Sequence, residues 1–569
     1  MPYGLLLQSV LIPIVASPFA YYLGRRFGSK ATSWFVFVIL LYSTIALLLS
    51  AQSGNPVDEY YPWFPQSLTG SSLLSSIGSF GLYVDGVSIP FAATIYIICT
   101  AVALYSVPYM RHRIAEQESE ERATGSASSG IDIQSDLEHP QSPGAVSTNQ
   151  NNSESASSVM VESAKNSSEA ESQRVKSRFG LYSALLLLYS AGMVGTVLAT
   201  NLIELYFFFE FMLVPSYFLI AEFGYGARGR ISLMYLLWTH VGALLMLLSF
   251  LAIGSQTNNF VFLGPNAMTA VHIASELLPW IVFGIVVGLF VKLAAVGLHI
   301  WLPYAHAEAP TPISALLSPA MIGIGGYIII RMFTLLLPGA YVDVSLGIAV
   351  WGVLTMFYGG IMALAQDDIK RLFAYSSVSQ MGYIIFGIAT ASSLGVGGSV
   401  FQFVSHGTAK AILFMVAGLI IVQAGGLRSI KNMGGLSTKL PVTAVCAMIG
   451  FLGLMGFPET NGFQSEWLIF AGGLKLGSQG ASAVSGYWLI LSILAVISTI
   501  ITASYALWTM KRVFFGQLPE KLANVKEGSA YMLAPLIFLA ILTILLGVLP
   551  NIVDTPLFHT LSQLPNPLR

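Results

Sequence analysis

The chain has 569 residues, of which 55% are hydrophobic and only 9% are charged, and its formal net charge is −1 at pH 7. Soluble domains carry about 25% charged residues, so this composition excludes an ordinary soluble protein. The near-zero net charge gives no sign of nucleic-acid binding. Cys99 and Cys446 each lie in an apolar run and are interpreted as small buried hydrophobes rather than a disulfide or a metal site. We therefore predict an all-α polytopic membrane protein.

Long apolar runs follow one another along the chain, and a spanning helix needs about 20 such residues. On this criterion about fourteen spans are predicted, near residues 4–24, 32–50, 86–107, 179–199, 202–222, 229–254, 278–300, 313–336, 344–365, 371–390, 398–423, 441–474, 486–511 and 530–552. The first lacks a basic segment before it and an obvious cleavage site, so we expect a retained helix rather than a signal peptide.

Two of these spans are predicted to be broken. The twelfth is too long for one straight helix and contains Gly456 and Pro458. The seventh leads into HIWLPYAHAEAPTPISALLSP, which begins at His299 and contains Pro303 and Pro310. A proline has no backbone N–H to donate, so this segment cannot form one continuous helix. The sequence thus places polar, helix-breaking residues where a membrane disfavours them.

Basic residues indicate the orientation of the spans. Nearly all basic clusters follow odd-numbered spans, at residues 25–30, 111–113, 228–230, 370–371, 428–431 and 511–512. Because such clusters mark cytoplasmic loops, odd-numbered spans are expected to end in the cytoplasm. Both termini are then expected on the outer side.

Residues 111–178 differ from the rest of the chain. They are rich in Ser, Glu, Asn and Gln, with eleven acidic and seven basic residues. A segment of this composition cannot bury enough apolar area to fold, so we predict a disordered polar insertion on the cytoplasmic side, between spans three and four.

Charged side chains inside a span are costly and are functional candidates by default. Glu210 lies in FFFEFMLVPSYFLI of span five, and Lys292 lies in VGLFVKLAAVGLHIWLP of span seven. The alternatives are a protonated carboxyl that only packs helices and a lysine that extends toward the membrane surface. A lysine this deep can also exchange its proton, so both residues are predicted to serve proton transfer.

Three more titratable residues lie in later spans. His406 and Lys410, in FVSHGTAKAILFMVAG, are four residues apart and so share one helical face. A lone histidine is usually a satisfied core residue, whereas this pair is predicted to form a relay. Glu466 follows the predicted break of span twelve, where water can reach a carboxyl.

The two halves of the chain also resemble each other weakly. Span six has His240 in LLWTHVGALL, and span eleven, five spans later, has His406 in FVSHGTAK. Spans seven and twelve are both interrupted. An offset of this kind is typical of the internal repeats of transporters.

Four motifs together resemble the antiporter-like subunits of respiratory complex I, namely WLPYAHAEAPTPISALLSP, DDIKRLFAYSSVSQMGY, HGTAKAILFMVAG and GFQSEW. Similar motifs occur in Mrp-type cation/proton antiporters and membrane-bound hydrogenases. The resemblance runs from about residue 80 to 550, outside the insertion. FFFEFMLVP and the glutamate in span twelve most resemble subunit M (mitochondrial subunit 4), because subunits L and N usually have lysine in span twelve.

The resemblance implies a fold of fourteen helices with two inverted five-helix repeats. Its expected organisation is helices 1–3, the insertion, a first repeat of helices 4–8, a second repeat of helices 9–13, and helix 14 with a tail, over residues 1–110, 111–178, 179–340, 341–515 and 516–569.

The resemblance also implies a function, that of a proton-translocating membrane subunit in a complex I-like NADH (or other donor):quinone oxidoreductase. Glu210 and Lys292 would form the charged pair of one half-channel and Glu466 would close the other. His299, His406 and Lys410 would be relay residues. His306 and Glu308 are expected to order the loop instead.

Partners and location follow from the same resemblance. The chain shows no Cys cluster and no dinucleotide-binding Gly loop, so FMN, iron–sulfur clusters and quinone are expected in partner subunits. The expected partners are L- and N-type antiporter-like subunits and small membrane subunits. The expected location is the inner or plasma membrane of a prokaryote rather than the mitochondrial inner membrane.

The chain departs from subunit M at three positions. Gly323 stands where subunit M usually has lysine, so the proton step of that lysine would fall to water or His240. Gln380 stands where histidine is common, and Lys410 stands where subunit M often lacks lysine.

Two rival hypotheses remain open. One is an Mrp-type Na⁺/H⁺ antiporter or membrane-bound hydrogenase subunit, and the other is a membrane scaffold without transport. Glu466 in place of lysine favours the oxidoreductase subunit, and a scaffold leaves Lys292 buried without purpose.

Overall fold

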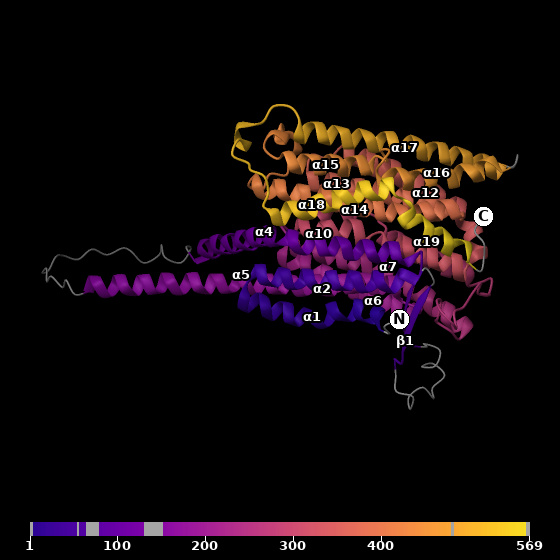
Figure 1. Ribbon diagram of the computed structural model, residues 1–569, viewed down its shortest axis with the longest axis horizontal. Helices are drawn as coiled ribbons and strands as arrows, with labels where there is room; N and C mark the ends of the chain where they lie inside the picture. The colour runs from indigo at the N-terminus through magenta and orange to yellow at the C-terminus, as the bar shows by residue number, and fades with distance from the viewer. Residues whose placement is uncertain (1–3, 54–55, 64–78, 130–151, 480–482, 565–569) are drawn as a thin grey trace.

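The structure is a computed structural model that describes residues 4–53, 56–63, 79–129, 152–479 and 483–564. Its helices lie roughly along the long axis of the molecule and form one broad bundle (Figure 1). The helices of this bundle are α1 (Leu5–Phe27), α2 (Ser29–Ser50), α4 (Ser88–Ser129), α5 (Asn152–Leu198), α6 (Leu202–Phe223), α7 (Arg228–Thr257), α8 (Leu278–Lys292), α9 (Trp301–Glu308), α10 (Thr311–Leu316), α11 (Ile324–Arg331), α12 (Pro338–Leu364), α13 (Ile369–Ala389), α14 (Ser393–Gln423), α15 (Pro441–Leu454), α16 (Asn461–Ser478), α17 (Ala483–Phe514), α18 (Ala530–Val548) and α19 (Asn551–Ser562).

The helices confirm the predicted class of an all-α polytopic membrane protein. Within the described ranges, twelve helical segments are long and apolar enough to cross a membrane, and α8 and α15 are shorter apolar helices. These fourteen segments fall on the fourteen predicted spans, although the number that cross a membrane and the inverted repeats stay predictions. The start of α1 and the end of α19 lie toward the same end of the bundle (Figure 1), as an even number of spans requires.

Both predicted breaks are present. Span seven divides into α8 and α9 with a non-helical turn between Lys292 and Trp301, and span twelve divides into α15 and α16. Span eight is continuous but irregular, because π-helical turns at Leu317–Met321 and Met332–Leu336 flank α11. Such turns often lie at functional sites. The irregular backbone lies inside the protein, since the whole apolar window of span eight is buried.

The predicted disorder of residues 111–178 needs a correction. Helix α4 continues to Ser129 and α5 begins at Asn152, so both extend beyond the bundle (Figure 1). The first part of the insertion is packed, because the buried Arg113 donates to the carbonyls of Phe223 and Gly224 at the end of α6. Composition alone missed these contacts. Residues 130–151 lie outside the described residues, and the role of the insertion stays a prediction.

A feature that the sequence did not predict is a small hairpin of β1 (Val57–Tyr61) and β2 (Phe80–Val84), paired antiparallel with Val57 opposite Val84. Glu59 of β1 accepts hydrogen bonds from the backbone N–H groups of Gly4, Leu6 and Leu7, and it thereby satisfies the free donors at the start of α1. The hairpin thus holds the first helix in place.

Directly after β2, Asp85 starts α4 and binds Arg331 of α11. Its carboxylate accepts from the backbone N–H of Ser88 at 2.8 Å and from Arg331 through both oxygens, at 2.6 and 2.9 Å. Burial alone would raise the pKa of Asp85, but the Arg331 charge and the hydrogen bonds outweigh it and lower the pKa. This buried pair joins the N-terminal helices to span eight.

Candidate proton-transfer site

Lys292 is the last residue of α8 and is fully buried. Its Nζ has no hydrogen-bond partner in the described part of the chain, and it lies 4.7 Å from the centre of the Phe209 ring. A cation over an aromatic face is attracted to the ring, but this contact does not replace a hydrogen-bond acceptor. Lys292 is therefore buried, as predicted, and its ammonium group has no hydrogen-bond acceptor among the described residues.

Glu210 follows Phe209 on α6, directly after the residue whose ring Lys292 contacts. Its Oε2 lies 3.1 Å from Nδ1 of His240 on α7, and its Oε1 has no partner among the described residues. No ion pair joins Glu210 to Lys292 in the described ranges, although the charges of the two groups interact. Sequence analysis predicted that Glu210 and Lys292 form a charged pair. The structure instead brings Glu210 to His240 and leaves the lysine apart from it.

The turn after Lys292 explains how the membrane tolerates a broken helix. Three tryptophan indoles donate to carbonyls of α8 or of this turn: Trp301 to Val291 at 2.8 Å, Trp351 to Val296 at 2.9 Å, and Trp238 to Leu298 at 2.9 Å. Each free carbonyl would otherwise cost free energy in an apolar environment. The tryptophans therefore fix the end of α8, and sequence analysis did not assign them this role.

His299 lies in the same turn and faces the second half of the chain. Its Nε2 is 3.2 Å from the hydroxyl of Tyr358 on α12, and its ring packs edge-on against the Tyr358 ring with the centroids 4.8 Å apart. Nδ1 has no partner in the described residues. The predicted relay residue thus links the broken span seven to the first helix of the second half.

The predicted loop-ordering role of His306 stays a prediction, and its carbonyl accepts a hydrogen bond from Ser314. It lies on α9, is fully buried and stacks on Phe414 with the ring centroids 5.0 Å apart. Neither ring nitrogen has a hydrogen-bond partner among the described residues. The chain after α9 is held by Lys370, which donates to the carbonyls of Ala307 and Ala309. Proline positions alone could not reveal this lysine anchor.

In the second half, Lys410 and His406 are both fully buried on α14. Lys410 donates to the Phe373 carbonyl at 3.0 Å and to the Ser376 hydroxyl, both on α13. His406 has no partner for either ring nitrogen in the described ranges. The two residues share a helical face as predicted, but no hydrogen bond joins them, so a relay between them would need a bridging group.

Glu466 is the sixth residue of α16, the helix that begins beyond the break in span twelve. It is 6% exposed, and its Oε1 has no partner among the described residues. The break approaches it closely, because a side chain at Gly456, which has a φ of +63°, would meet the Glu466 carboxylate. Glycine is therefore needed at position 456 for both backbone conformation and space.

A row of buried amides and hydroxyls lies near Glu466 and was not predicted. Ser465 donates to Gln402 at 2.5 Å, Gln402 donates to Gln380 at 2.5 Å, and Gln380 donates to the Leu454 carbonyl at 3.3 Å. Sequence analysis noted only that Gln380 stands where related subunits commonly have histidine. In the structure Gln380 links α13 to α14 and α15, and Gln402 continues the row to Ser465 on α16.

Comparisons with known proteins agree with this architecture. A family model described as "NADH:quinone oxidoreductase/Mrp antiporter, TM" matches residues 199–502, and one described as "NADH-Ubiquinone oxidoreductase (complex I), chain 5 N-terminus" matches residues 76–117. Broken spans with buried lysine and glutamate therefore belong to an antiporter-like membrane subunit. The chain is a member of the NADH:quinone oxidoreductase/Mrp antiporter family.

Curated relatives point to one branch of this family. F(420)H(2) dehydrogenase subunit M of Methanosarcina mazei is 32% identical over 387 residues, which are 65% of this chain and 74% of that protein. NADH-quinone oxidoreductase subunit M of Rickettsia bellii is 31% identical over 381 residues, with 66% and 74% covered. The predicted recognition of a subunit M-like, antiporter-like membrane protein is confirmed.

Solved structures share the fold. A chain of respiratory complex I from Thermus thermophilus with bound NADH has a TM-score of 0.72 at 21% identity, with 97% of each chain covered. A chain of the Mrp complex from Dietzia sp. has the same TM-score at 17% identity, with 99% of this chain and 97% of that chain covered. At these identities the two likenesses show a shared fold.

Proposed function

We propose that this chain carries protons across the membrane as the M-type subunit of a quinone-reducing complex, with Glu210, Lys292, His299, His406, Lys410 and Glu466 as its proton-transfer residues. The observation that carries the proposal is that Lys292 and Glu466, at the two broken spans, are buried and that Nζ of the lysine and Oε1 of the glutamate have no hydrogen-bond partner among the described residues. Burying an unpaired ionisable group is costly, and this fold contains such groups at both broken spans. A scaffold would gain nothing from them.

The first half-channel is proposed to work as a switch at Glu210. The carboxylate is hydrogen-bonded to His240 at 3.1 Å, and Lys292 lies nearby without an acceptor. When the carboxylate turns toward Lys292, it stabilises the ammonium; when it turns toward His240, the ammonium loses that partner and can release its proton. Lys292 lies at the end of α8, next to the non-helical turn that separates α8 from α9.

The second half-channel is proposed to use Lys410 for the step that lysine in span eight performs in related M subunits. Gly323 leaves no titratable group in that position, and its place is filled by the ring of Phe403. Lys410 is fully buried, donates to a carbonyl and a hydroxyl, and lies over the Phe373 ring, so among the described residues no counter-charge fixes its proton. From there the amide row of Gln380 and Gln402 leads toward Glu466.

The partners and cofactors are proposed from the same relatives. FMN, iron–sulfur clusters and quinone are assigned to other subunits, and a prokaryotic inner or plasma membrane is the proposed location. The relatives from Methanosarcina and Rickettsia are subunits of an F(420)H(2) dehydrogenase and an NADH-quinone oxidoreductase, which leaves the electron donor of this complex to be measured. An Mrp-type Na⁺/H⁺ antiporter is the second candidate, supported by the equal TM-score of the Mrp chain.

The experiment uses the complex that copurifies with this chain from its native membrane, reconstituted in vesicles. Addition of each electron donor and a quinone should produce proton uptake, and Glu466→Gln should reduce that uptake strongly while Glu466→Asp retains part of it. The abundance of each variant is checked by the subunits that copurify. Sodium-gradient-driven proton movement without any redox subunit would support the Mrp alternative, and normal uptake by Glu466→Gln would assign Glu466 to packing.

A further inference from the structure

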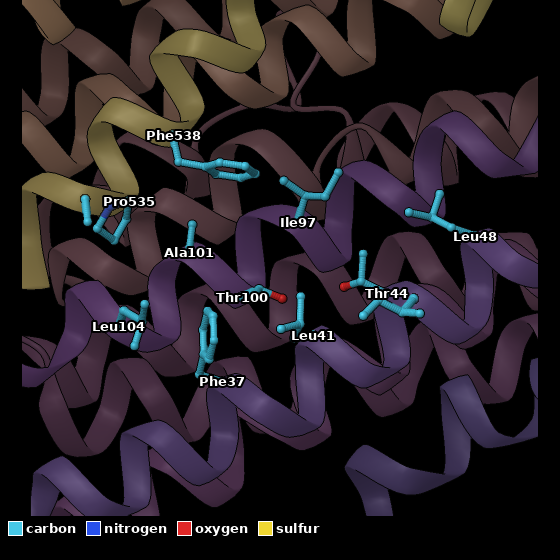
Figure 2. A pocket seen from close by; sticks show the side chains of 12 residues that line it. Phe37, Leu41, Thr44, Leu48, Ile97, Thr100, Ala101, Leu104, Pro535 and Phe538 are labelled. Carbon is cyan, nitrogen blue, oxygen red and sulfur yellow. The ribbon is translucent and has the colours of Figure 1, made fainter.

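An apolar groove opens on the side of the bundle, between α2, α4 and α18. It has a volume of about 460 Å³, in the range of ordinary small-molecule sites. Figure 2 shows Phe37, Leu41 and Leu48 on one wall, Ile97, Thr100 and Leu104 on another, and Pro535 and Phe538 closing the third.

The groove offers nothing polar to a ligand. Its two hydroxyls are already used, because Thr44 donates to the Leu40 carbonyl and Thr100 donates to the Tyr96 carbonyl, both at 2.7 Å. Its rim is apolar and open, since Ile45 is 47% exposed and Phe538 is 51% exposed. A hydrocarbon chain matches this lining, whereas a polar solute would lose its hydration without compensation.

The end of the groove near Phe37 and Leu104 carries groups suited to a membrane surface. Trp34 lies one turn before Phe37, and its Nε1 donates to the hydroxyl of Tyr531 on α18 at 3.2 Å. Both are amphipathic aromatic residues of the kind that gather at headgroup depth. This aromatic contact therefore indicates which end of the groove faces the headgroups.

Two basic residues, Lys30 and Arg111, lie past this aromatic contact, on the same faces of α2 and α4 that line the groove. Lys30 lies seven residues before Phe37 on α2, and Arg111 lies seven residues after Leu104 on α4, so each is two turns along the face that lines the groove. Both are exposed, and neither has an ion-pair partner within the part of the chain that the structure describes. The nearby acid Glu527 is engaged elsewhere, with Val442 and Thr443.

We propose that this groove is a binding site for an anionic membrane lipid, with one hydrocarbon chain between α2, α4 and α18 and the headgroup between Lys30 and Arg111. The order of groups toward this end of the three helices carries the assignment: first the apolar groove, then Trp34 of α2 with Tyr531 of α18, then the exposed Lys30 of α2 and Arg111 of α4. The bound lipid fills the space between α18, near the end of the chain, and two of the first three spans. It is separate from the buried proton-transfer residues.

The test uses the native complex with a phosphatidylglycerol probe that carries a photoactivatable diazirine on its acyl chain. Cross-links should map to peptides of α2, α4 and α18. Each cation near a headgroup contributes about a fivefold preference, so Lys30→Ala with Arg111→Ala should bind the probe about 25-fold more weakly. The matched control is Arg25→Ala with Arg26→Ala, two exposed basic residues at the end of α1 that lie off the groove, and it should bind normally.

A second variant tests the hydrocarbon part. Ala101→Trp fills the groove and should abolish the cross-links, whereas Val241→Trp, on a lipid-facing position of α7 that is 58% exposed, should leave them unchanged. Equal labelling by a phosphatidylcholine probe would contradict the anionic headgroup. Cross-links unchanged by Ala101→Trp, or groove peptides cross-linked to a neighbouring subunit instead of lipid, would overturn the site.

Discussion

Replacing Asp85 by asparagine should destabilise the subunit strongly, because it leaves the guanidinium of Arg331 buried without a counter-charge. Both side chains are nearly inaccessible, 3% and 2% exposed, and two hydrogen bonds join them. Breaking a buried pair by removing one partner costs about 3–5 kcal/mol. Asp85 also satisfies the first N–H groups of α4, but asparagine keeps an oxygen for that task. Most of the loss should therefore come from the unpaired arginine.

The assay is thermal unfolding of the purified complex, followed by release of this subunit, for Asp85→Asn, Arg331→Met and the double variant. The double variant should be less destabilised than the sum of the single variants, because it removes the pair without stranding a charge. Asp58→Asn, on the exposed side of neighbouring β1, is the control and should behave like the parent. If Asp85→Asn matches Asp58→Asn, the buried pair does not hold α4 to span eight.

The same pair has a defined pH dependence. The pKa of Asp85 is lowered in the folded protein, so its stabilising effect is fully present above the unfolded pKa of about 4. It is lost only as the pH falls through the lower folded pKa. Between pH 5 and 8 the difference in stability between the parent and Asp85→Asn should therefore be constant.

Three further changes test other parts of the structure. Lys410→Met should lower donor-driven proton uptake at least about tenfold, which corresponds to about 1.4 kcal/mol. Unchanged uptake would show that Lys410 does not replace the lysine that span eight lacks at Gly323. Gly456→Ala should push the Glu466 carboxylate aside and lower uptake several-fold with assembly intact, as measured by uptake per copurified complex; parent-like uptake would show that the break adapts. Replacing residues 123–170 with a short polar linker should leave assembly and uptake intact, and loss of assembly would show that this segment docks a partner.

The spans and both breaks could be predicted because they depend on local properties of the chain. Twenty apolar residues define a span, and proline or glycine within one interrupts the backbone wherever the segment lies. Lys292 and Glu466 could be found for the same reason, since a charge in a long apolar run needs no knowledge of its neighbours. The extension of α4 into residues 111–129 could not be predicted, because it depends on Arg113 reaching carbonyls at the end of α6.

The contacts of the site depend on packing between distant helices. Sequence analysis paired Glu210 with Lys292 on the basis of charge, whereas the structure places the carboxylate at His240. Sequence analysis had considered His240 as part of a repeat and as a substitute for the lysine missing from span eight, but not as a partner of Glu210. Trp351 of α12 donates to the Val296 carbonyl in the turn after Lys292, and it lies 59 residues after Lys292 in the chain. Apolar patterning cannot distinguish such a tryptophan from an ordinary core residue.

The measurement that tests the central claim most directly is donor-driven proton uptake by vesicles containing the native complex with Lys292→Arg. Arginine keeps the positive charge but does not release its proton, so the account predicts that uptake is abolished, as it is for Lys292→Met, while the subunit still inserts and copurifies. Lys475→Met, a change at an exposed lysine near the end of α16, should pump like the parent. Parent-like pumping by Lys292→Arg would contradict proton release from Lys292.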